Sequence, residues 1–222
     1  MVIMSKSWFE QMEEYELENR FSIQNYIESI SKKIKSEFEE YDKYHPAILG
    51  IKNGQNIYDL IRTIKPAIVV ETGVCNGFSS SIILKAMEKN DRGELYSVDL
   101  PVRIDEIKND GRTGAVLPPG KDSGWAVPDD LRKRWNLYIG NTYEKLPEVF
   151  EDVPKKIDFF LHDSDHSYET MMFEFALAWY HLKKKGFVVA DNVTFSWAFY
   201  DFTERKELDR FRLGEMGLTK KI

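Results

Sequence analysis

The stretch Ala67 to Ser80, AIVVETGVCNGFSS, decides the fold. Its first four residues are apolar and mostly β-branched, which is typical of a strand buried on both faces of a parallel sheet. An acid, Glu71, follows this run, then a turn from Gly73 to Gly77, and then a helix that opens at Ser79. Strand, glycine-bearing turn and helix N-terminus together bring bare backbone N–H groups against a nucleotide-like ligand.

The spacing of the turn, E-x-G-x-x-x-G, differs from the G-x-G-x-x-G of dinucleotide-binding turns. Cys75 and Phe78 stand in a segment where a pyrophosphate needs close backbone approach, which disfavours an NAD-linked oxidoreductase. An acid at the strand end with few glycines suits a ligand that carries a positive amino group and no phosphate. S-adenosylmethionine (SAM) is such a ligand, and Cys75 is then a small turn residue and not a nucleophile.

Composition excludes several classes of protein. The 222 residues are 42% hydrophobic and 31% charged, which is ordinary for a globular protein of one large domain. A net charge of −6 argues against nucleic acid as a partner, because phosphate binding needs a basic face. The single cysteine favours a reducing, cytoplasmic compartment. No membrane partner is expected, since no apolar run reaches the length of a span and the N-terminus lacks a signal-peptide core.

The N-terminal part of the chain is predicted to be helical. Apolar residues at steps of three and four predict one amphipathic helix, on Ile23, Tyr26, Ile27, Ile30, Ile34, Phe38 and Tyr41. Trp8, Phe9, Met12 and Tyr15 suggest a shorter helix before it. The stripe packs on the core, forms a homodimer or acts as a lid over the pocket. We therefore divide the chain into an N-terminal helical extension, 1–50, and a main domain, 51–222.

The main domain alternates strands and helices. Strands are predicted at 67–70, 94–98, 136–139, 157–161 and 187–190, with helices at 56–65, 79–87, 142–150, 168–184 and 195–207. A hairpin of 210–213 and 218–221 closes the chain. This pattern predicts an α/β fold, a doubly wound and mostly parallel sheet that binds ligands at the carboxyl ends of its strands.

Polar residues stand at the predicted strand ends. Asp99 ends the second strand, where an acid can accept hydrogen bonds from both ribose hydroxyls, although a turn or cap role is the alternative. Asn141 follows the third strand, where it either contacts an adenine edge or caps the next helix. Ser79, at the start of its helix, and Leu100, directly after Asp99, complete this part of the predicted cofactor site together with Gly73.

Acids and amides gather after the fourth and fifth strands. Asp163 follows the fourth strand, and Asp191 and Asn192 follow the fifth. Three such oxygen ligands could share a hard cation such as Mg²⁺. A cation there would bind a substrate hydroxyl and lower its pKa. His166 and Asp165 are the candidate bases, and the alternative for His166 is a loop histidine that only bonds its neighbours.

Two segments carry a family resemblance. HDSDHSYE at 162–169 and ADNV at 190–193 resemble the small-molecule O-methyltransferases of the class I SAM-dependent fold, and Glu71 to Gly77 resembles motif I of that class. In the catechol and caffeoyl-coenzyme A members, acids and an amide at the positions of Asp163, Asp191 and Asn192 hold the metal. A lysine stands there where His166 stands here, so the base differs.

A closer resemblance is to a branch with D-x-D-H-S/T-Y, G-W-x-V-P and L-R-x-R-W segments and an N/D-V-x-x-x-x-A-F-x-D-F segment. Here these are Asp163 to Tyr168, Gly124 to Pro128, Leu131 to Trp135 and Asn192 to Phe202. The resemblance implies a seven-stranded Rossmann-like sheet, SAM as cofactor and a small-molecule acceptor such as a sugar or a secondary metabolite. Not all members of the branch need a metal.

The resemblance also assigns roles around the cofactor. Gly73 and Gly77 form the floor under the methionine end of SAM, Glu71 lies beneath its amino group, and Asp163 completes the set. The predicted function is SAM-dependent methyl transfer to a hydroxyl of a small molecule, with Mg²⁺ as an optional aid. The alternative is a non-catalytic protein of the same fold that serves binding or assembly.

Overall fold

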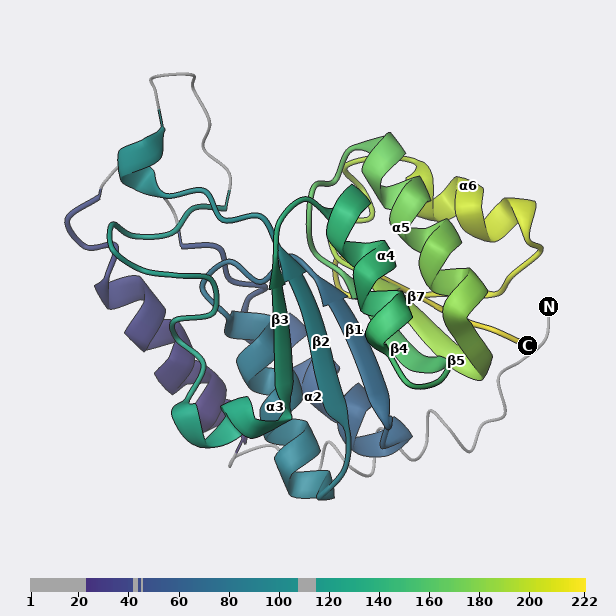
Figure 1. The fold of residues 1–222 in the computed structure, drawn as a ribbon, viewed down its shortest axis with the longest axis horizontal. Coiled ribbons are helices and arrows are strands. Elements are labelled where there is room, and N and C mark those ends of the chain that lie inside the picture. Colours follow the sequence, from purple (N-terminus) through teal and green to yellow (C-terminus); the bar gives the residue numbers. More distant parts are fainter. Residues whose placement is uncertain (1–22, 42–43, 45, 108–114) are drawn as a thin grey trace.

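The centre of the molecule is one seven-stranded sheet, seen in a computed structural model that describes residues 23–41, 44, 46–107 and 115–222 (Figure 1). The shorter helix predicted around Trp8 to Tyr15 lies outside the described residues. The strands are β1 (Ile68–Thr72), β2 (Glu94–Asp99), β3 (Trp135–Ile139), β4 (Ile157–His162), β5 (Leu182–Ala190), β6 (Arg210–Leu213) and β7 (Met216–Lys220).

The strand order is β3-β2-β1-β4-β5-β7-β6. Strands β1 to β5 run parallel, β7 is antiparallel to β5, and β6 pairs with β7 in the predicted hairpin. The doubly wound, mostly parallel α/β sheet is therefore confirmed. The order reverses between β1 and β4, and at such a switch point the two connections leave in opposite directions and open a crevice at the strand ends.

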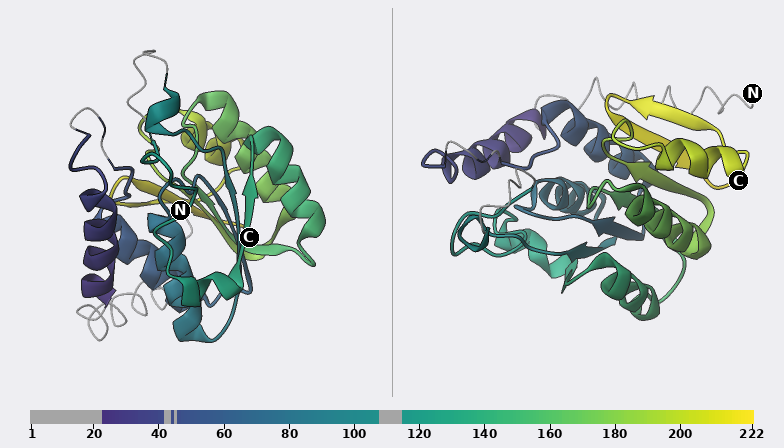
Figure 2. Two further views of the ribbon diagram at one scale, coloured as in Figure 1. Left: turned by 60° about the vertical axis from the view of Figure 1, so that its left-hand side comes forward. Right: turned by 90° about the horizontal axis from the view of Figure 1, so that it is seen from above.

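Helices cover both faces of the sheet. The figures place α4 (Thr142–Asp152), α5 (Tyr168–His181) and α6 (Ala198–Arg205) on one face (Figures 1 and 2). The other face carries α2 (Ile51–Ile64), α3 (Phe78–Asn90) and a helix over residues 23–36. Short 3₁₀ turns η1 (Ile104–Glu106) and η2 (Asp129–Arg134) lie in the segment between β2 and β3. Two apolar clusters, one on each face, form the core.

Several predicted boundaries are wrong. The N-terminal helix ends at residue 36 and not near Tyr41, α2 begins at Ile51 and not at residue 56, and β5 begins at Leu182 and not at residue 187. The helix predicted to run to residue 184 ends at His181, because Leu182 already pairs with Ile157 at the start of β5. The helix predicted from residue 195 begins at Ala198, after a turn in which the Phe195 N–H donates to the Asn192 carbonyl. Strand pairing ends α5 early, and a tight turn delays the start of α6. In both places these backbone hydrogen bonds override the local helical pattern.

The amphipathic N-terminal helix packs on the core. Five of its predicted stripe residues are buried in the same cluster as α2 and α3, namely Ile23, Ile27, Ile30, Ile34 and Phe38. This stripe is consequently covered by the chain itself and does not act as a lid. The homodimer through the N-terminal helices and the boundary at residue 50 stay predictions.

Ile27→Ala is expected to destabilise the whole domain. Ile27 is fully buried, and truncation of a buried isoleucine to alanine costs about 2–5 kcal/mol of the free energy of unfolding. Urea denaturation measures it, with Lys32→Ala on the exposed side of the same helix as the control. An unchanged unfolding midpoint for Ile27→Ala would show that the helix is an independent extension.

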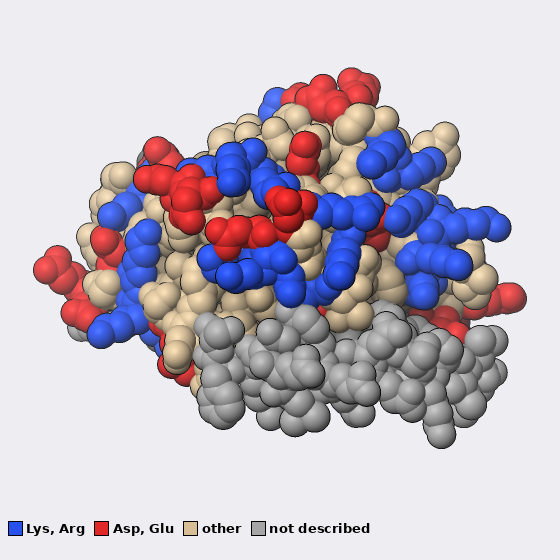
Figure 3. Space-filling model, turned by 90° about the horizontal axis from the view of Figure 1, so that it is seen from below, with Lys and Arg blue, Asp and Glu red and all other residues tan. Residues whose placement is uncertain are grey.

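Among the described residues, no helix combines the length and the apolar character needed to cross a bilayer. Lys and Arg side chains are interspersed with Asp and Glu on the face seen from below (Figure 3).

Candidate active site

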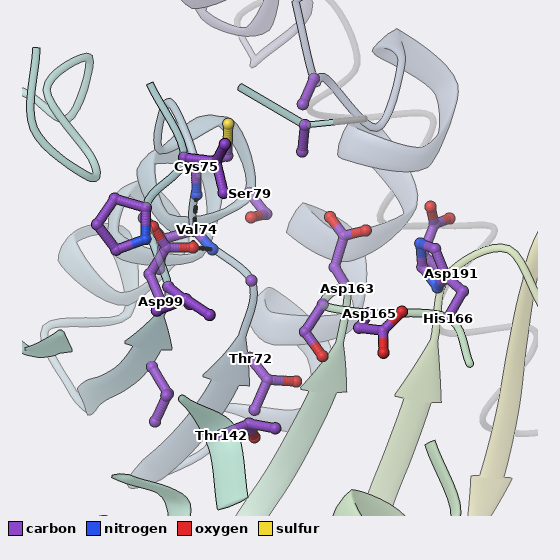
Figure 4. Close-up of a pocket in the computed structure, with 18 of the residues that line it drawn as sticks. Thr72, Val74, Cys75, Ser79, Asp99, Thr142, Asp163, Asp165, His166 and Asp191 are labelled. Carbon is purple, nitrogen blue, oxygen red and sulfur yellow. Dashed lines mark hydrogen bonds between the residues drawn. The ribbon is translucent and has the colours of Figure 1, made fainter. Parts of the chain in front are cut away.

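A cavity of about 800 Å³ opens at the carboxyl ends of the parallel strands. It lies at the switch point between β1 and β4, and its size is that of a site for a cofactor and a small ligand. In Figure 4, Asp99 and the turn after β1 lie at one end, His166 and Asp191 lie at the other, and Asp163 lies between them. The cavity thus joins the two groups of residues that the sequence placed at the sheet edge.

The glycine turn owes its residues to close packing. Gly73 has φ +84°, lines the cavity, and would place a Cβ atom 1.9 Å from the carbonyl oxygen of Asp163. Gly77 has φ +89° and packs against Gly124 instead, so it supports the turn. Contrary to the prediction, Gly77 does not line the cavity. Cys75 lies in the left-handed region at φ 45°, and burial raises the pKa of its thiol, which agrees with a turn residue and not a nucleophile.

Glu71 is not among the residues that line the cavity, and its place beneath the cofactor's amino group stays a prediction. The side chain is fully buried and accepts hydrogen bonds from the hydroxyls of Ser79 (2.5 Å), Ser80 (2.6 Å) and Ser97 (2.8 Å). Burial raises the pKa of its carboxyl group. Glu71 therefore ties β1 to β2 and α3, while Ser79 itself lines the cavity as predicted.

Asp99 holds the glycine turn. One carboxylate oxygen accepts the backbone N–H groups of Val74 (2.8 Å) and Cys75 (3.0 Å), and the other accepts the hydroxyl of Ser123 (Figure 4). Asp99 lines the cavity as predicted, but its partners in this structure are protein groups where ribose hydroxyls were expected. Ser123, in the glycine-rich segment before β3, was missed because nothing in its local sequence marks it.

Leu100 and Asn141 stand at the same end of the cavity. Leu100 lines the cavity with 59% of its surface exposed, so its apolar side chain is available to pack against the ring of a ligand. Asn141 also lines it, and its side chain accepts the Tyr143 N–H at 2.8 Å, so the capping role considered for it is real.

Toward the other end, Asp163 in the middle of the cavity forms a cluster with His166 and Asp191, and one ligand atom from each lies within 4.8 Å of the other two. Burial and the neighbouring carboxylates raise the pKa of Asp163, and burial raises that of Asp191 to about 6. Asp191 Oδ1 is buried without a hydrogen-bond partner among the described residues. Two adjacent acids with an unpartnered oxygen fit a cation, or else share a proton.

Asn192 was predicted as the third metal ligand, and the structure brings His166 into that group. Asn192 lines the cavity at φ 50°, and its amide nitrogen lies 3.4 Å from His166 Nε2. Burial, followed by the effect of His162, lowers the pKa of His166 to about 4. The imidazole of His166 is therefore neutral at physiological pH and able to accept a proton.

Asp165, the alternative base, serves the start of α5. Its carboxylate accepts the hydroxyls of Ser167 (2.6 Å) and Thr170 (2.9 Å) and the Ser167 N–H (3.2 Å). These hydrogen bonds, that of the Ser167 hydroxyl first, hold its pKa below the ordinary value and tie Asp165 to Ser167, the N-cap residue of α5. Asp165 does line the cavity, but its donors bind it to the helix.

Sequence reasoning missed a buried network behind the cluster. Glu174 on α5 accepts the hydroxyls of Thr72, Thr142 and Ser164 and contacts His162 at the end of β4. Burial opposes its ionisation, but His162 and the hydroxyls outweigh burial and lower the pKa of Glu174. Its only signal in the sequence is an acid between the apolar residues of the inner face of α5.

A model of the methyltransferase domain family matches residues 70–193 of the chain. Among curated proteins, none matches the sequence significantly. Among solved structures, the O-methyltransferase from Bacillus cereus in complex with SAH is 12% identical with a TM-score of 0.62, covering 90% of this chain and 97% of that one.

Two further structures are similar. The O-methyltransferase TomG from Streptomyces achromogenes, in complex with SAM, is 16% identical with a TM-score of 0.58, over 90% of this chain and 94% of its own. A putative caffeoyl-CoA O-methyltransferase from Staphylococcus aureus is 15% identical with a TM-score of 0.59, over 90% and 99%. At such identities the likeness shows the fold, in agreement with the seven-stranded sheet.

Proposed function

This chain belongs to the methyltransferase domain family, and we propose that it transfers the methyl group of SAM to a hydroxyl of a small molecule. The observation that carries the proposal is the single cavity that joins the glycine turn to the cluster of Asp163, His166 and Asp191. One end of it suits a cofactor with an amino group and no phosphate, and the other holds the groups that ionise a hydroxyl.

The cofactor end is proposed to bind SAM, which supplies the electrophilic methyl group. Gly73 leaves the backbone of the turn open to the cofactor, and Leu100 and Asn141 offer an apolar face and a polar edge to the adenine. Asp163, in the middle of the cavity, is placed to face the methionine end. The protein's contribution here is alignment, since a methyl transfer needs the acceptor oxygen in line with the departing sulfur.

At the other end, His166 is proposed as the base. It is neutral at physiological pH, lines the cavity, and is not held by a helix N-terminus as Asp165 is. Its Nε2 atom takes the proton of the acceptor hydroxyl. The acceptor oxygen then forms a bond to the methyl carbon as the carbon–sulfur bond of SAM breaks and the demethylated cofactor leaves.

Mg²⁺ is proposed as an aid. The carboxylates of Asp163 and Asp191, with the side chain of Asn192 beside them, would hold it, and the unpartnered Asp191 oxygen fits this role. When bound, the ion would lower the pKa of the acceptor hydroxyl. The acceptor itself, a sugar or a secondary metabolite, and a cytoplasmic location remain part of the proposal.

Titration of the protein with SAM in a calorimeter tests the cofactor. Binding is expected below millimolar SAM, and Asp99→Asn is expected to weaken it about 10–100-fold, because charge-assisted hydrogen bonds to the turn N–H groups are worth about 1.5–3 kcal/mol. Asp122→Asn, at an exposed acid paired with Arg103, is the control. The same affinity in Asp99→Asn and wild type would remove Asp99 from the cofactor site.

Chelation tests the metal. EDTA is expected to lower methyl transfer to an acceptor panel of sugars and hydroxylated aromatics, and added Mg²⁺ to restore it. Calorimetric titration with Mg²⁺ alone should show a site that Asp191→Asn loses, because Asp191 Oδ1 has no hydrogen-bond partner in the part of the chain that the structure describes. A full rate in chelator would leave Asp163 and Asp191 sharing a proton and remove the metal from the proposal.

A further inference from the structure

Behind the cavity, two buried side chains form a line with His166. Glu174 and His162 are both fully buried, and Glu174 Oε2 lies 2.7 Å from His162 Nδ1. His162 Nε2 lies 3.3 Å from His166 Nδ1, and the two rings meet at 81°. The line runs from α5 through the end of β4 to His166 on the cavity wall. Figure 4 shows His166 there, beside Asp191.

At the inner end of this line, the donor follows from Glu174. Glu174 accepts hydroxyls from Thr72 (2.5 Å), Thr142 (2.8 Å) and Ser164 (2.7 Å), so its carboxylate is an acceptor throughout. His162 must then donate its Nδ1–H to Glu174, and its Nε2 atom faces His166 Nδ1. The direction of the contact between the two imidazoles is set at the outer end, by the partner of His166 Nε2.

The outer end of the line fixes this direction. The amide nitrogen of Asn192, which can only donate, lies 3.4 Å from His166 Nε2, so Nε2 carries the lone pair while Nδ1 carries the proton and donates to His162 Nε2. The ring of Phe195 stands edge-on against His166 at 5.5 Å between centroids, which limits rotation of the imidazole on the cavity side. Both nitrogens and one edge of His166 are therefore specified by neighbours.

We propose that Glu174 and His162 are positioning residues that hold His166 in the Nδ1–H tautomer, with the Nε2 lone pair turned toward Asn192 and the cavity. A histidine's tautomer is set by the hydrogen bond that its other nitrogen makes, and outer partners of this kind are worth about 10–100-fold in activity. Without the line, His166 is free to place its proton on Nε2, where it can neither accept a proton nor offer a lone pair to a ligand.

The nitrogen-15 spectrum of the histidine rings measures the tautomer directly. The chain has four histidines, so a sample labelled only in histidine gives few signals, and His166→Gln identifies those of His166. Wild type is expected to show protonated Nδ1 and bare Nε2 at His166. A protonated Nε2 in the neutral wild-type ring would overturn the proposal without any variant.

Two variants then test the cause. Glu174→Gln removes the charged acceptor, and His162→Asn keeps an amide donor near Glu174 while removing the contact with His166. Both are expected to shift His166 toward the Nε2–H tautomer, and Glu169→Gln and His181→Asn on the same helix are the controls. If His162 served only to satisfy Glu174, His162→Asn would leave the His166 spectrum unchanged, and the proposal would fail.

The rate gives a second readout, which rests on the proposed function. Both variants are expected to lower kcat about 10–100-fold with the KM for SAM unchanged, because only the orientation of His166 is affected. A tautomer shift in a protein without methyl transfer on the acceptor panel would support the positioning role and count against the proposed function instead. A lowered kcat with an unchanged tautomer would overturn the positioning role alone.

Discussion

His166→Ala is expected to lower kcat about 10²–10⁴-fold, the contribution of a positioned general base. The imidazole lines the cavity beside Asp163 and Asp191, and burial keeps its pKa near 4, so that the neutral form is present throughout the physiological range. Steady-state rates at saturating SAM, with the best acceptor of the panel, measure the loss. The dissociation constant of SAM should stay unchanged, since the cofactor end of the cavity does not involve His166.

A matched control is available on α5. His181→Gln replaces a histidine whose ring stacks on Phe150 at 4.3 Å, away from the cavity, and should keep the wild-type rate. If His166→Ala keeps its rate but loses the Mg²⁺ site, His166 is a metal ligand and not the base. If it keeps both, the histidine belongs to the loop and the base has to be sought elsewhere.

The strand pattern allowed much of this site to be predicted. Parallel strands share one carboxyl edge, so the residues after β2, β4 and β5 had to meet there, and Asp99, Asp163 and Asp191 do. What a strand pattern does not specify is the side of the backbone on which an acid falls. Glu71 is one residue before the end of β1, and its buried carboxylate accepts the hydroxyls of three serines and does not reach the cavity.

The partners of the predicted residues were beyond the sequence for a different reason. Ser123 and Glu174 lie 24 and 12 positions from the residues that they contact, Asp99 and His162. Contacts over such separations depend on how loops and helices pack. Neither a serine in a glycine-rich stretch nor an acid in an amphipathic helix predicts a contact of this kind. Asp165 illustrates the converse, because its hydrogen bonds are local and go to Ser167, the N-cap residue only two positions along the chain.

Gly73→Ala is expected to disable both ends of the site at once. A Cβ atom there would lie 1.9 Å from the carbonyl oxygen and 2.4 Å from the carbonyl carbon of Asp163, and 2.8 Å from the Ser164 nitrogen. These are backbone atoms, and the Asp163 N–H donates to the Thr72 carbonyl at 2.9 Å, so the start of the loop cannot give way alone. The left-handed φ adds about 1–2 kcal/mol to this cost.

Gly120→Ala separates the two costs. Gly120 has φ +70°, close to that of Gly73, but a Cβ atom there meets nothing within 4 Å. We expect Gly120→Ala to lose only about 1–2 kcal/mol of stability, and Gly73→Ala to lose more than about 4 kcal/mol or to fail to fold. Thermal unfolding measures the difference. Equal losses would mean that the turn after β1 tolerates a side chain by moving apart from β4. In that case a folded Gly73→Ala should still lose both SAM binding and methyl transfer, because Gly73 lines the cofactor end and Asp163, which the displacement moves, lies between the two ends of the cavity.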